Sequence, residues 1–173
     1  MAARSRMFWG PLTAFGLGTA AIACVLDQAS KLWLLDVFDL AGKGVVKLMP
    51  FVDLVLTWNT GISYGWFQQE GPFGQGALLA LKVVAVALLW IWLAKAASRL
   101  SAVSLGLIIG GAIGNGIDRL AYGAVADFVL LHAETATWRF NWYVFNLADV
   151  AIVAGVTGLL YESVWGDSAP KAP

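Results

Sequence analysis

Four long apolar segments, separated by more polar connections, dominate the pattern along this 173-residue chain. They cover about residues 11–35, 76–97, 100–122 and 145–165, and each is close to the roughly 20 residues that a membrane-spanning helix needs. Hydrophobic residues make up 60% of the chain and charged residues 13%, with a mean hydropathy of +0.74. A soluble domain has about 45–50% apolar and about 25% charged residues. The pattern therefore predicts a mainly α-helical membrane protein, with four transmembrane helices in one domain over residues 1–173.

The connection over residues 36–75 is too long for a simple hairpin loop and contains a strand-like pattern. Over residues 51–58, side chains rich in β-branched and aromatic types alternate in character with a period of two, which is typical of a strand. The pattern ends at Asn59-Thr60-Gly61, a turn signal, and Ile62–Phe67 is consistent with a return strand. We therefore expect a small β-sheet platform over about residues 43–70, lying on the membrane surface.

The charges of the connections predict an orientation. One side of the four-span arrangement holds Arg4, Arg6, Lys95, Arg99 and Lys171, and the other holds Lys43, Lys47 and Arg139. Cytoplasmic loops carry an excess of Lys and Arg, so the first side is assigned to the cytoplasm. Both termini are then cytoplasmic. The sheet platform and the second long connection, residues 123–144, lie at the outer (periplasmic) surface.

In this topology, polar side chains from every segment converge on the outer face. They are Asp27, Asn59, Asn115, Arg119, Asp127, Asn146 and Asp149. Ionisable residues in or beside membrane spans are costly, usually face the interior of a bundle and usually have a function. We interpret this level of the molecule as the functional site.

The third apolar segment carries a row of small residues. Ala102, Gly106, Gly110 and Gly114 recur every four residues, a spacing that lets another helix approach closely. Asp118 continues the row near its outer end. The glycines are therefore predicted to be packing residues.

Two lysines in the apolar segments have competing interpretations. Asp27 and Lys31 are four residues apart, hence on one helix face, and form either a self-neutralising pair at a helix end or an anchor for the site. Lys82 lies about two turns inside the second span. We interpret Lys82 as reaching the interface by snorkelling rather than taking part in chemistry.

Composition excludes several classes of chemistry. With 11 basic and 11 acidic residues the formal net charge is zero, so no basic surplus favours nucleic acid as a partner. Cys24 and His132 are the single cysteine and histidine, which excludes an internal disulfide and argues against a His/Cys metal site and Ser–His catalysis. The sequence also lacks Walker and dinucleotide-binding motifs. Acid–base chemistry by carboxylates remains.

Asp127 and Asp149 are the candidate carboxylate pair. One lies in the second connection and the other at the start of the next helix, so one fold of the chain can bring them together. Two carboxylates a few ångströms apart cannot both ionise comfortably, because like charges at 4 Å repel by roughly 4 kcal/mol at an effective dielectric of 20. The pair then shares one proton, and can activate a water and protonate a substrate. Hydrogen bonds to this pair or the substrate would come from Asn59, Asn115, Asn146 and Arg119.

Five short motifs, in order along the chain, resemble those of the bacterial lipoprotein signal peptidase family (signal peptidase II). They are Asp27-Gln28-x-x-Lys31, Asn59-Thr60-Gly61, Gly114-Asn115-x-x-Asp118-Arg119, Val125-Ala126-Asp127-Phe128 and Phe145-Asn146-Leu147-Ala148-Asp149. The four-span layout is also similar, so the resemblance covers most of the chain.

The resemblance implies an aspartic endopeptidase of the bacterial inner membrane. Such an enzyme removes the signal peptide from diacylglyceryl-modified prolipoproteins by cutting just before the lipidated cysteine. Asp127 and Asp149 would be catalytic, and Asp118 would support the structure, paired with Arg119 or a lysine. Other substrate-binding or supporting residues would be Asn59, Gly61, Asn115, Arg119, Asn146, Asp27 and Lys31. The implied partners are lipid-modified signal peptides and membrane lipid. No metal or organic cofactor is implied, and we expect a monomer.

The sequence departs from the family pattern in three places. Ile62-Ser63-Tyr64 stands where the family usually has alanine, a small residue and phenylalanine. Val125-Ala126 replaces a pair of valines, and Glu134–Asn141 is similar to an insertion. These departures concern the shape of the loops and substrate preference, not the predicted chemistry.

Two other functional classes are open from the sequence. A small membrane transporter or proton channel would use intramembrane Asp and Lys as a relay and place polar groups at several depths. A non-catalytic assembly factor would use the glycine row to bind a partner helix. Apart from Lys82, the polar groups cluster at one end of the spans, which favours the peptidase.

Overall fold

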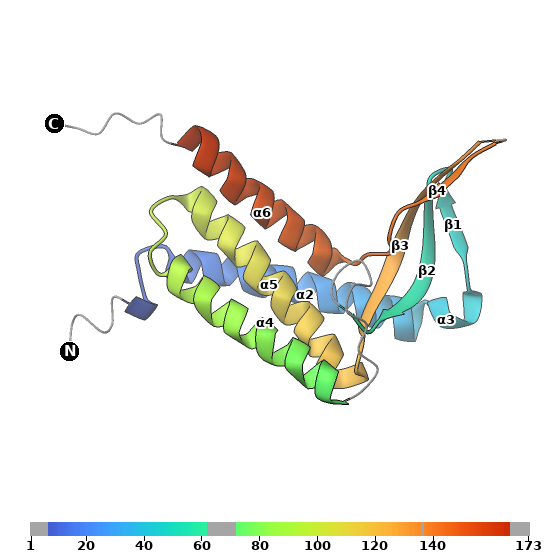
Figure 1. Ribbon diagram of the computed structural model, residues 1–173, viewed down its shortest axis with the longest axis horizontal. Coiled ribbons are helices and arrows are strands. Elements are labelled where there is room, and N and C mark those ends of the chain that lie inside the picture. Colours follow the sequence, from blue (N-terminus) through green and yellow to red (C-terminus); the bar gives the residue numbers. More distant parts are fainter. Residues whose placement is uncertain (1–6, 62–71, 136, 167–173) are drawn as a thin grey trace.

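The computed structural model describes residues 7–61, 72–135 and 137–166. Four long helices form a bundle, and an antiparallel sheet projects from one end of it (Figure 1). The helices are α2 (Thr13–Leu32), α4 (Pro72–Leu93), α5 (Arg99–Tyr122) and α6 (Leu147–Trp165). They occupy the four apolar segments of the sequence, so the prediction of a mainly helical protein with a small sheet is confirmed.

Three helices of the described residues are long and apolar enough to cross a membrane. They are α4 over Gly76–Leu93, α5 and α6, with mean hydropathies of 2.3, 1.7 and 1.5. The 20-residue α2 is not in this group, because it is rich in Ala, Gly, Thr and Ser and carries Asp27 and Lys31. Side chains such as Leu88 of α4 and Leu160 of α6 are exposed, as expected for surfaces that face lipid.

Glycines set the close packing of α5 against its neighbours. A methyl group added at Gly110 would collide with the carbonyl oxygen of Ala20 on α2, and one at Gly111 with the carbonyl oxygen of Ala148 on α6. Close backbone approach of this kind is the main use of small residues between membrane helices. The predicted row of small residues is therefore a packing face inside the molecule.

The sheet combines strands from both long connections. Its order is β1 (Val46–Met49), β2 (Val52–Asn59), β3 (Val125–Glu134) and β4 (Arg139–Asn141), and every neighbouring pair is antiparallel. β2 confirms the strand expected from the alternation over 51–58. The expected return strand Ile62–Phe67 lies outside the described residues. Within the described residues, β2 pairs with β3, and Thr57 of β2 lies opposite Asp127 of β3.

The segment Glu134–Asn141, interpreted above as an insertion, contributes the tip of the β3–β4 hairpin and the strand β4. A π-helical turn (Trp33–Val37) and the short helix α3 (Leu40–Lys43) lead from α2 into the sheet. Leu34 and Leu40 of these turns pack with Phe128 of β3 in a small apolar core. The sheet is thus fixed to the C-terminal end of α2.

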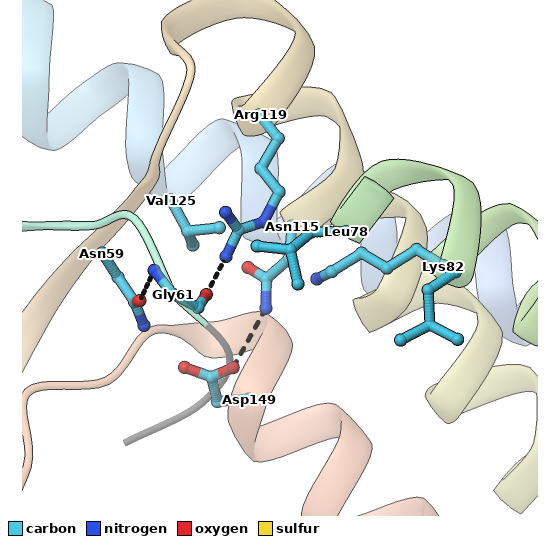
Figure 2. Close-up of a pocket in the computed structure, with 9 residues that line it drawn as sticks. Asn59, Gly61, Leu78, Lys82, Asn115, Arg119, Val125 and Asp149 are labelled. Atoms are coloured by element: carbon cyan, nitrogen blue, oxygen red, sulfur yellow. Dashed lines mark hydrogen bonds between the residues drawn. The ribbon is translucent and has the colours of Figure 1, made fainter. Parts of the chain in front are cut away.

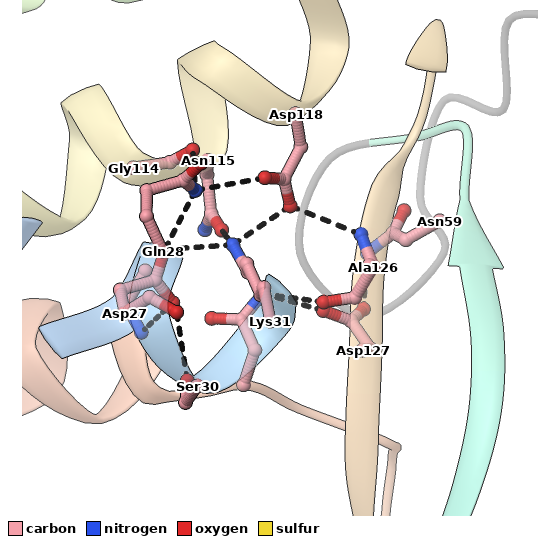
Figure 3. A network of polar contacts seen from close by, with 12 residues as sticks. Asp27, Gln28, Ser30, Lys31, Asn59, Gly114, Asn115, Asp118, Ala126 and Asp127 are labelled. Atoms are coloured by element: carbon pink, nitrogen blue, oxygen red, sulfur yellow. Dashed lines mark hydrogen bonds and ion pairs between the residues drawn. The ribbon is translucent and has the colours of Figure 1, made fainter. Parts of the chain in front are cut away.

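A buried ion cluster joins this end of the bundle to the sheet (Figure 3). The ammonium of Lys31 lies 2.8 Å from Asp27 Oδ2 and 2.7 Å from Asp118 Oδ2. These side chains are 2%, 0% and 1% exposed, respectively. Gln28 Nε2 donates to the second Asp118 oxygen at 2.9 Å, and Lys31 also donates to Asn115 Oδ1 at 3.1 Å. The cluster therefore ties α2 to α5 without exposing charge.

Both carboxylates of the cluster also hold backbone N–H groups. Asp118 Oδ2 accepts from the N–H of Ala126 in β3 at 3.1 Å, and Asp27 Oδ1 accepts from the N–H of Ala148 in α6 at 2.9 Å. Each of these alanines is the residue before an aspartate of the candidate pair. The cluster thus fixes the chain immediately before Asp127 and immediately before Asp149.

We expect Lys31→Met to destabilise the protein by about 3–5 kcal/mol, because it leaves two buried carboxylates without their counterion. The measurement is thermal unfolding of the purified variant in detergent micelles. Lys47→Met is the matched control, since Lys47 is exposed on β1 and surface substitutions usually change stability by less than about 0.5 kcal/mol. Equal melting temperatures for the two variants would contradict the bracing role of the cluster.

We expect Gly110→Ala to lower the melting temperature, because the added methyl group forces α2 and α5 apart. Gly18→Ala on α2 is the control: a methyl group there meets no atom within 4 Å. In a helix this change should stabilise by roughly 0.5–1 kcal/mol, since alanine loses less conformational freedom. Opposite signs for the two alanines are the expected result. A melting temperature of Gly110→Ala equal to or above that of wild type would show that close packing at Gly110 does not limit stability.

Candidate active site

Asp127 and Asp149 lie on different elements but line the same groove. Asp127 is on β3 and is buried, whereas Asp149 is half-buried in the first turn of α6. Asn146 is the N-cap of α6: its side-chain oxygen accepts from the Asp149 N–H at 3.0 Å, and Asp149 Oδ2 accepts from the Asn146 N–H at 3.2 Å. This reciprocal capping box orients the Asp149 carboxylate at the start of the helix.

Two asparagine amides connect the carboxylates. The Asn146 Nδ2 group donates to Asp127 Oδ1 at 2.7 Å and to Asn115 Oδ1 at 2.9 Å. Asn115 Nδ2 in turn donates to Asp149 Oδ1 at 3.0 Å. A continuous chain of hydrogen bonds therefore runs from one aspartate to the other, through α5 and the cap of α6.

The Asn59-Thr60-Gly61 turn supplies the remaining contact to Asp127. Asn59 Nδ2 donates to Asp127 Oδ2 at 3.2 Å, while Asn59 Oδ1 accepts from the Gly61 N–H at 3.0 Å. The guanidinium of Arg119 donates to the Gly61 carbonyl, as Figure 2 shows. Arg119 therefore acts through the turn: it fixes Gly61, which fixes the amide orientation of Asn59.

Burial changes the protonation of Asp127. Removal of the carboxylate from water raises its pKa, and the negative charge of Asp149 raises it further, whereas hydrogen bonds from Asn59 and Asn146 oppose the shift. The resulting pKa is about 7. At neutral pH Asp127 is therefore poised to hold or release a proton, which is the property required of one member of an acid–base pair.

Two hollows meet beside the pair, where both are lined by Asn59 and Asp149. The first, which we call the polar pocket, has a volume of about 150 Å³ (Figure 2). It is lined by Asn59, Gly61, Leu78, Leu81, Lys82, Asn115, Arg119, Val125 and Asp149. The second, which we call the apolar groove, has a volume of about 550 Å³. Its apolar lining comes from Leu131, Trp142, Val144, Phe145, Val150, Ile152, Val153 and Ala154, with Tyr143, Asn59, Asp127 and Asp149.

The structure divides the residues singled out from the sequence into two groups. Those that line the hollows are Asn59, Gly61, Asn115, Arg119, Asp127 and Asp149. Asp27, Lys31 and Asp118 form the buried cluster beneath them, and the hydrogen bond from Lys31 to Asn115 links the two groups. Asn146 joins Asn115 to Asp127. Of the two partners considered for Asp118, the lysine is present: it is Lys31.

Two residues near the site were not assigned to it from the sequence. Gln28 was part of a motif, and its side-chain amide bridges Asp27, Gly114 and Asp118. Lys82 was interpreted as snorkelling, yet it lines the polar pocket. The apolar residues around Lys82 in the sequence do not indicate that its side chain lines a pocket, because the direction of that side chain depends on how α4 is rotated against α5.

Sequence relatives cover almost the whole chain. The chain is 62% identical over 164 residues to a lipoprotein signal peptidase of Rhodopseudomonas palustris, covering 94% of this chain and 100% of that protein. It is 61% identical over 158 residues to a lipoprotein signal peptidase of Nitrobacter hamburgensis, covering 91% of this chain and 96% of that protein.

Solved structures agree on the fold. A bacterial membrane enzyme determined by the in meso method at 2.3 Å resolution has a TM-score of 0.66 at 21% identity, covering 92% of this chain and 95% of that chain. A second such structure, at 1.9 Å resolution, has a TM-score of 0.65 at 22% identity, covering 94% and 99%. The sequence model of the family described as signal peptidase (SPase) II matches residues 19–165. With this match and relatives above 60% identity, the chain belongs to the signal peptidase II family.

Proposed function

We propose that this protein is an aspartic endopeptidase that removes the signal peptide from diacylglyceryl-modified prolipoproteins, cutting just before the lipidated cysteine. Removal of signal peptides from prolipoproteins rests on the family and on relatives that are lipoprotein signal peptidases over most of their length. The aspartic mechanism rests on one observation. Asp127 and Asp149 are held by a shared chain of amides and open onto the same groove.

The pair divides the roles of acid and base. We assign Asp149 the role of the base, because both of its oxygens accept N–H bonds and it lies at the start of α6, where a carboxylate is favoured. Asp127 holds the proton near neutral pH. Asp149 takes a proton from a water as the water oxygen attacks the scissile carbonyl carbon, and Asp127 protonates the carbonyl oxygen. Asp149 then gives its new proton to the cysteine nitrogen as the C–N bond breaks. Asp127 takes a proton back from a hydroxyl of the tetrahedral intermediate as the carbonyl forms again, which restores the starting protonation of both carboxylates.

The apolar groove suits the hydrophobic part of such a substrate. It runs along the first turns of α6, where Val150 and Val153 carry exposed side chains. Burial of apolar surface contributes roughly 25 cal/mol per Å², so lipid chains or an apolar signal sequence are stabilised there. The carboxylate pair lines the same groove, so a bond next to the lipidated residue can reach it.

The proposed location is the bacterial inner membrane, with a single domain of four spans. α2 is the first span, with its charged end closed by the ion cluster. In Figure 1 the first residues of α2 and the last of α6 lie at the end of the bundle opposite the sheet. By the charge argument above, that end is cytoplasmic, and the sheet and active site are periplasmic. We propose a monomer, since the row of small residues is already covered by α2, and the neighbouring Gly111 by α6.

A transporter or proton channel is not favoured. Its relay would need titratable groups at successive depths, whereas the buried carboxylates of α2, α5 and β3 gather at one end. The relatives named above are peptidases over nearly their full length. The glycine row, which an assembly factor would offer to a partner helix, is occupied within the molecule.

We expect Asp127→Asn and Asp149→Asn each to reduce cleavage by about 10²-fold to 10⁴-fold, the usual contribution of a positioned acid or base. The assay incubates detergent-purified enzyme with a diacylglyceryl-modified precursor and follows the loss of the signal-peptide mass. Asp36→Asn is the control, because Asp36 is exposed. Full activity of either variant of the pair would refute the aspartic mechanism.

We expect Asp118→Asn to act on stability rather than on chemistry. It weakens the ion cluster and the bond to the Ala126 N–H, so the melting temperature should fall. At a temperature where the variant remains folded, turnover should persist. A variant with the wild-type melting temperature and no turnover would place Asp118 in the catalytic step instead.

We expect turnover to fall as the pH rises through about 7, because the acid Asp127 loses its proton there. The same group affects stability: its folded pKa is raised above the unfolded value, so its contribution to stability is lost as the pH rises from about 4 to about 7. The measurements are pH profiles of kcat and of the melting temperature. In Asp127→Asn this component of the stability profile should disappear, and an unchanged slope would contradict the assignment.

A further inference from the structure

Lys82 faces the active site from a membrane helix. It follows the start of α4 at Pro72 by ten residues, which is about 15 Å at 1.5 Å per residue. Figure 2 shows its side chain directed toward Asn115 on α5, with its ammonium group in the polar pocket.

The ammonium of Lys82 has no hydrogen bond or ion pair within the part of the chain that the structure describes. A lysine in a membrane-spanning helix normally pairs with a carboxylate or a carbonyl, or faces a water-filled cavity. Lys31 illustrates the first case, with two carboxylates within 2.8 Å. Lys82 illustrates the last, and its three N–H donors are available to a molecule that enters the pocket.

The size and lining of the polar pocket define that molecule. At about 150 Å³ the polar pocket is much smaller than the apolar groove, at about 550 Å³, so it suits a small polar group such as a carbonyl better than a long acyl chain. Its walls carry two cations, Lys82 and Arg119, against one carboxylate, Asp149. This surplus of positive charge favours oxygen atoms that accept hydrogen bonds.

The pocket also borders the reacting bond. Asp149 and Asn59 line both hollows, whereas Lys82 lines the polar pocket alone. A substrate whose apolar part fills the groove, and whose scissile bond lies at the pair, must extend a neighbouring polar group into the pocket. This step rests on the proposed function, which supplies the substrate.

We propose that Lys82 is a substrate-binding residue that donates a charged hydrogen bond to a carbonyl oxygen next to the scissile bond. Two parts of the substrate offer this chemistry: the peptide backbone before the cysteine, and the ester groups of the diacylglyceryl moiety. Because the bond forms on substrate binding, its loss acts on KM more than on kcat.

The test compares Lys82→Met with wild type on two precursors, one with the diacylglyceryl group and one with a dialkyl ether that lacks ester carbonyls. A charged hydrogen bond of ordinary strength predicts a rise in KM of about tenfold or more, with kcat changed by less than about threefold. A rise with the ester substrate alone identifies the ester oxygens as the ligand. A rise with both substrates identifies the peptide carbonyls.

Two further variants control for charge and for the substitution itself. Lys82→Arg keeps a cationic donor and should have a KM between those of wild type and Lys82→Met. Lys95→Met changes an exposed lysine just after the other end of α4 and should leave KM unchanged. Wild-type KM for Lys82→Met on both substrates would overturn the proposal, as would a loss confined to kcat.

A binding measurement separates this proposal from the proposed function. The Kd of each lipidated precursor is measured for Asp149→Asn, with and without Lys82→Met, so that no cleavage is required. Weaker binding by about tenfold in the double variant supports the role of Lys82 even if the wild-type enzyme cleaves neither precursor. Equal Kd values overturn it, whatever the activity of the wild type.

Discussion

The arrangement of this molecule depends on the placement of one buried cation, Lys31, between two buried carboxylates. Desolvating three charges is costly, and the cost is offset only if every oxygen and N–H of the cluster finds a partner. The partners are the N–H groups of Ala126 and Ala148, with the amides of Gln28 and Asn115. Because these groups come from α2, α5, β3 and α6, the cluster is satisfied only when all four elements are in register.

This constraint links stability to the position of the proposed catalytic pair. The two backbone groups held by the cluster belong to the residues just before Asp127 and Asp149. The asparagines then act one layer above: Asn146 caps α6 and bonds Asp127, while Asn115 bonds Lys31 and Asp149. The buried charge of Lys31 thus positions the two carboxylates of the proposed pair through neutral amide side chains.

The sequence predicted those parts of this arrangement that depend on local signals. Apolar length predicted the four helices, and alternation predicted β2. β3 was not predicted, because its first four residues, Val125–Phe128, are all buried and so show no alternation; its pairing with β2 joins residues some 70 positions apart. The choice between Arg119 and a lysine as partner of Asp118 depended on the rotation of α2 against α5. Helix periodicity does not fix this rotation, and the glycine contacts do.

The direction of the Lys82 side chain also depends on how two helices are rotated against each other. It bears on how the proposed site distinguishes substrates. In sequence, a lysine in an apolar segment near the membrane surface is accounted for by snorkelling, so no pocket is required. Packing of α4 against α5 instead brings Lys82 and Asn115 to one cavity, which shares Asp149 with a groove of opposite character. A purely apolar segment would leave the polar pocket without a ligand, and a purely polar one would leave the groove empty. In the proposed reaction, the meeting of the two hollows at Asn59 and Asp149 therefore favours a substrate that is apolar on one side of its scissile bond and rich in carbonyl oxygen beside it.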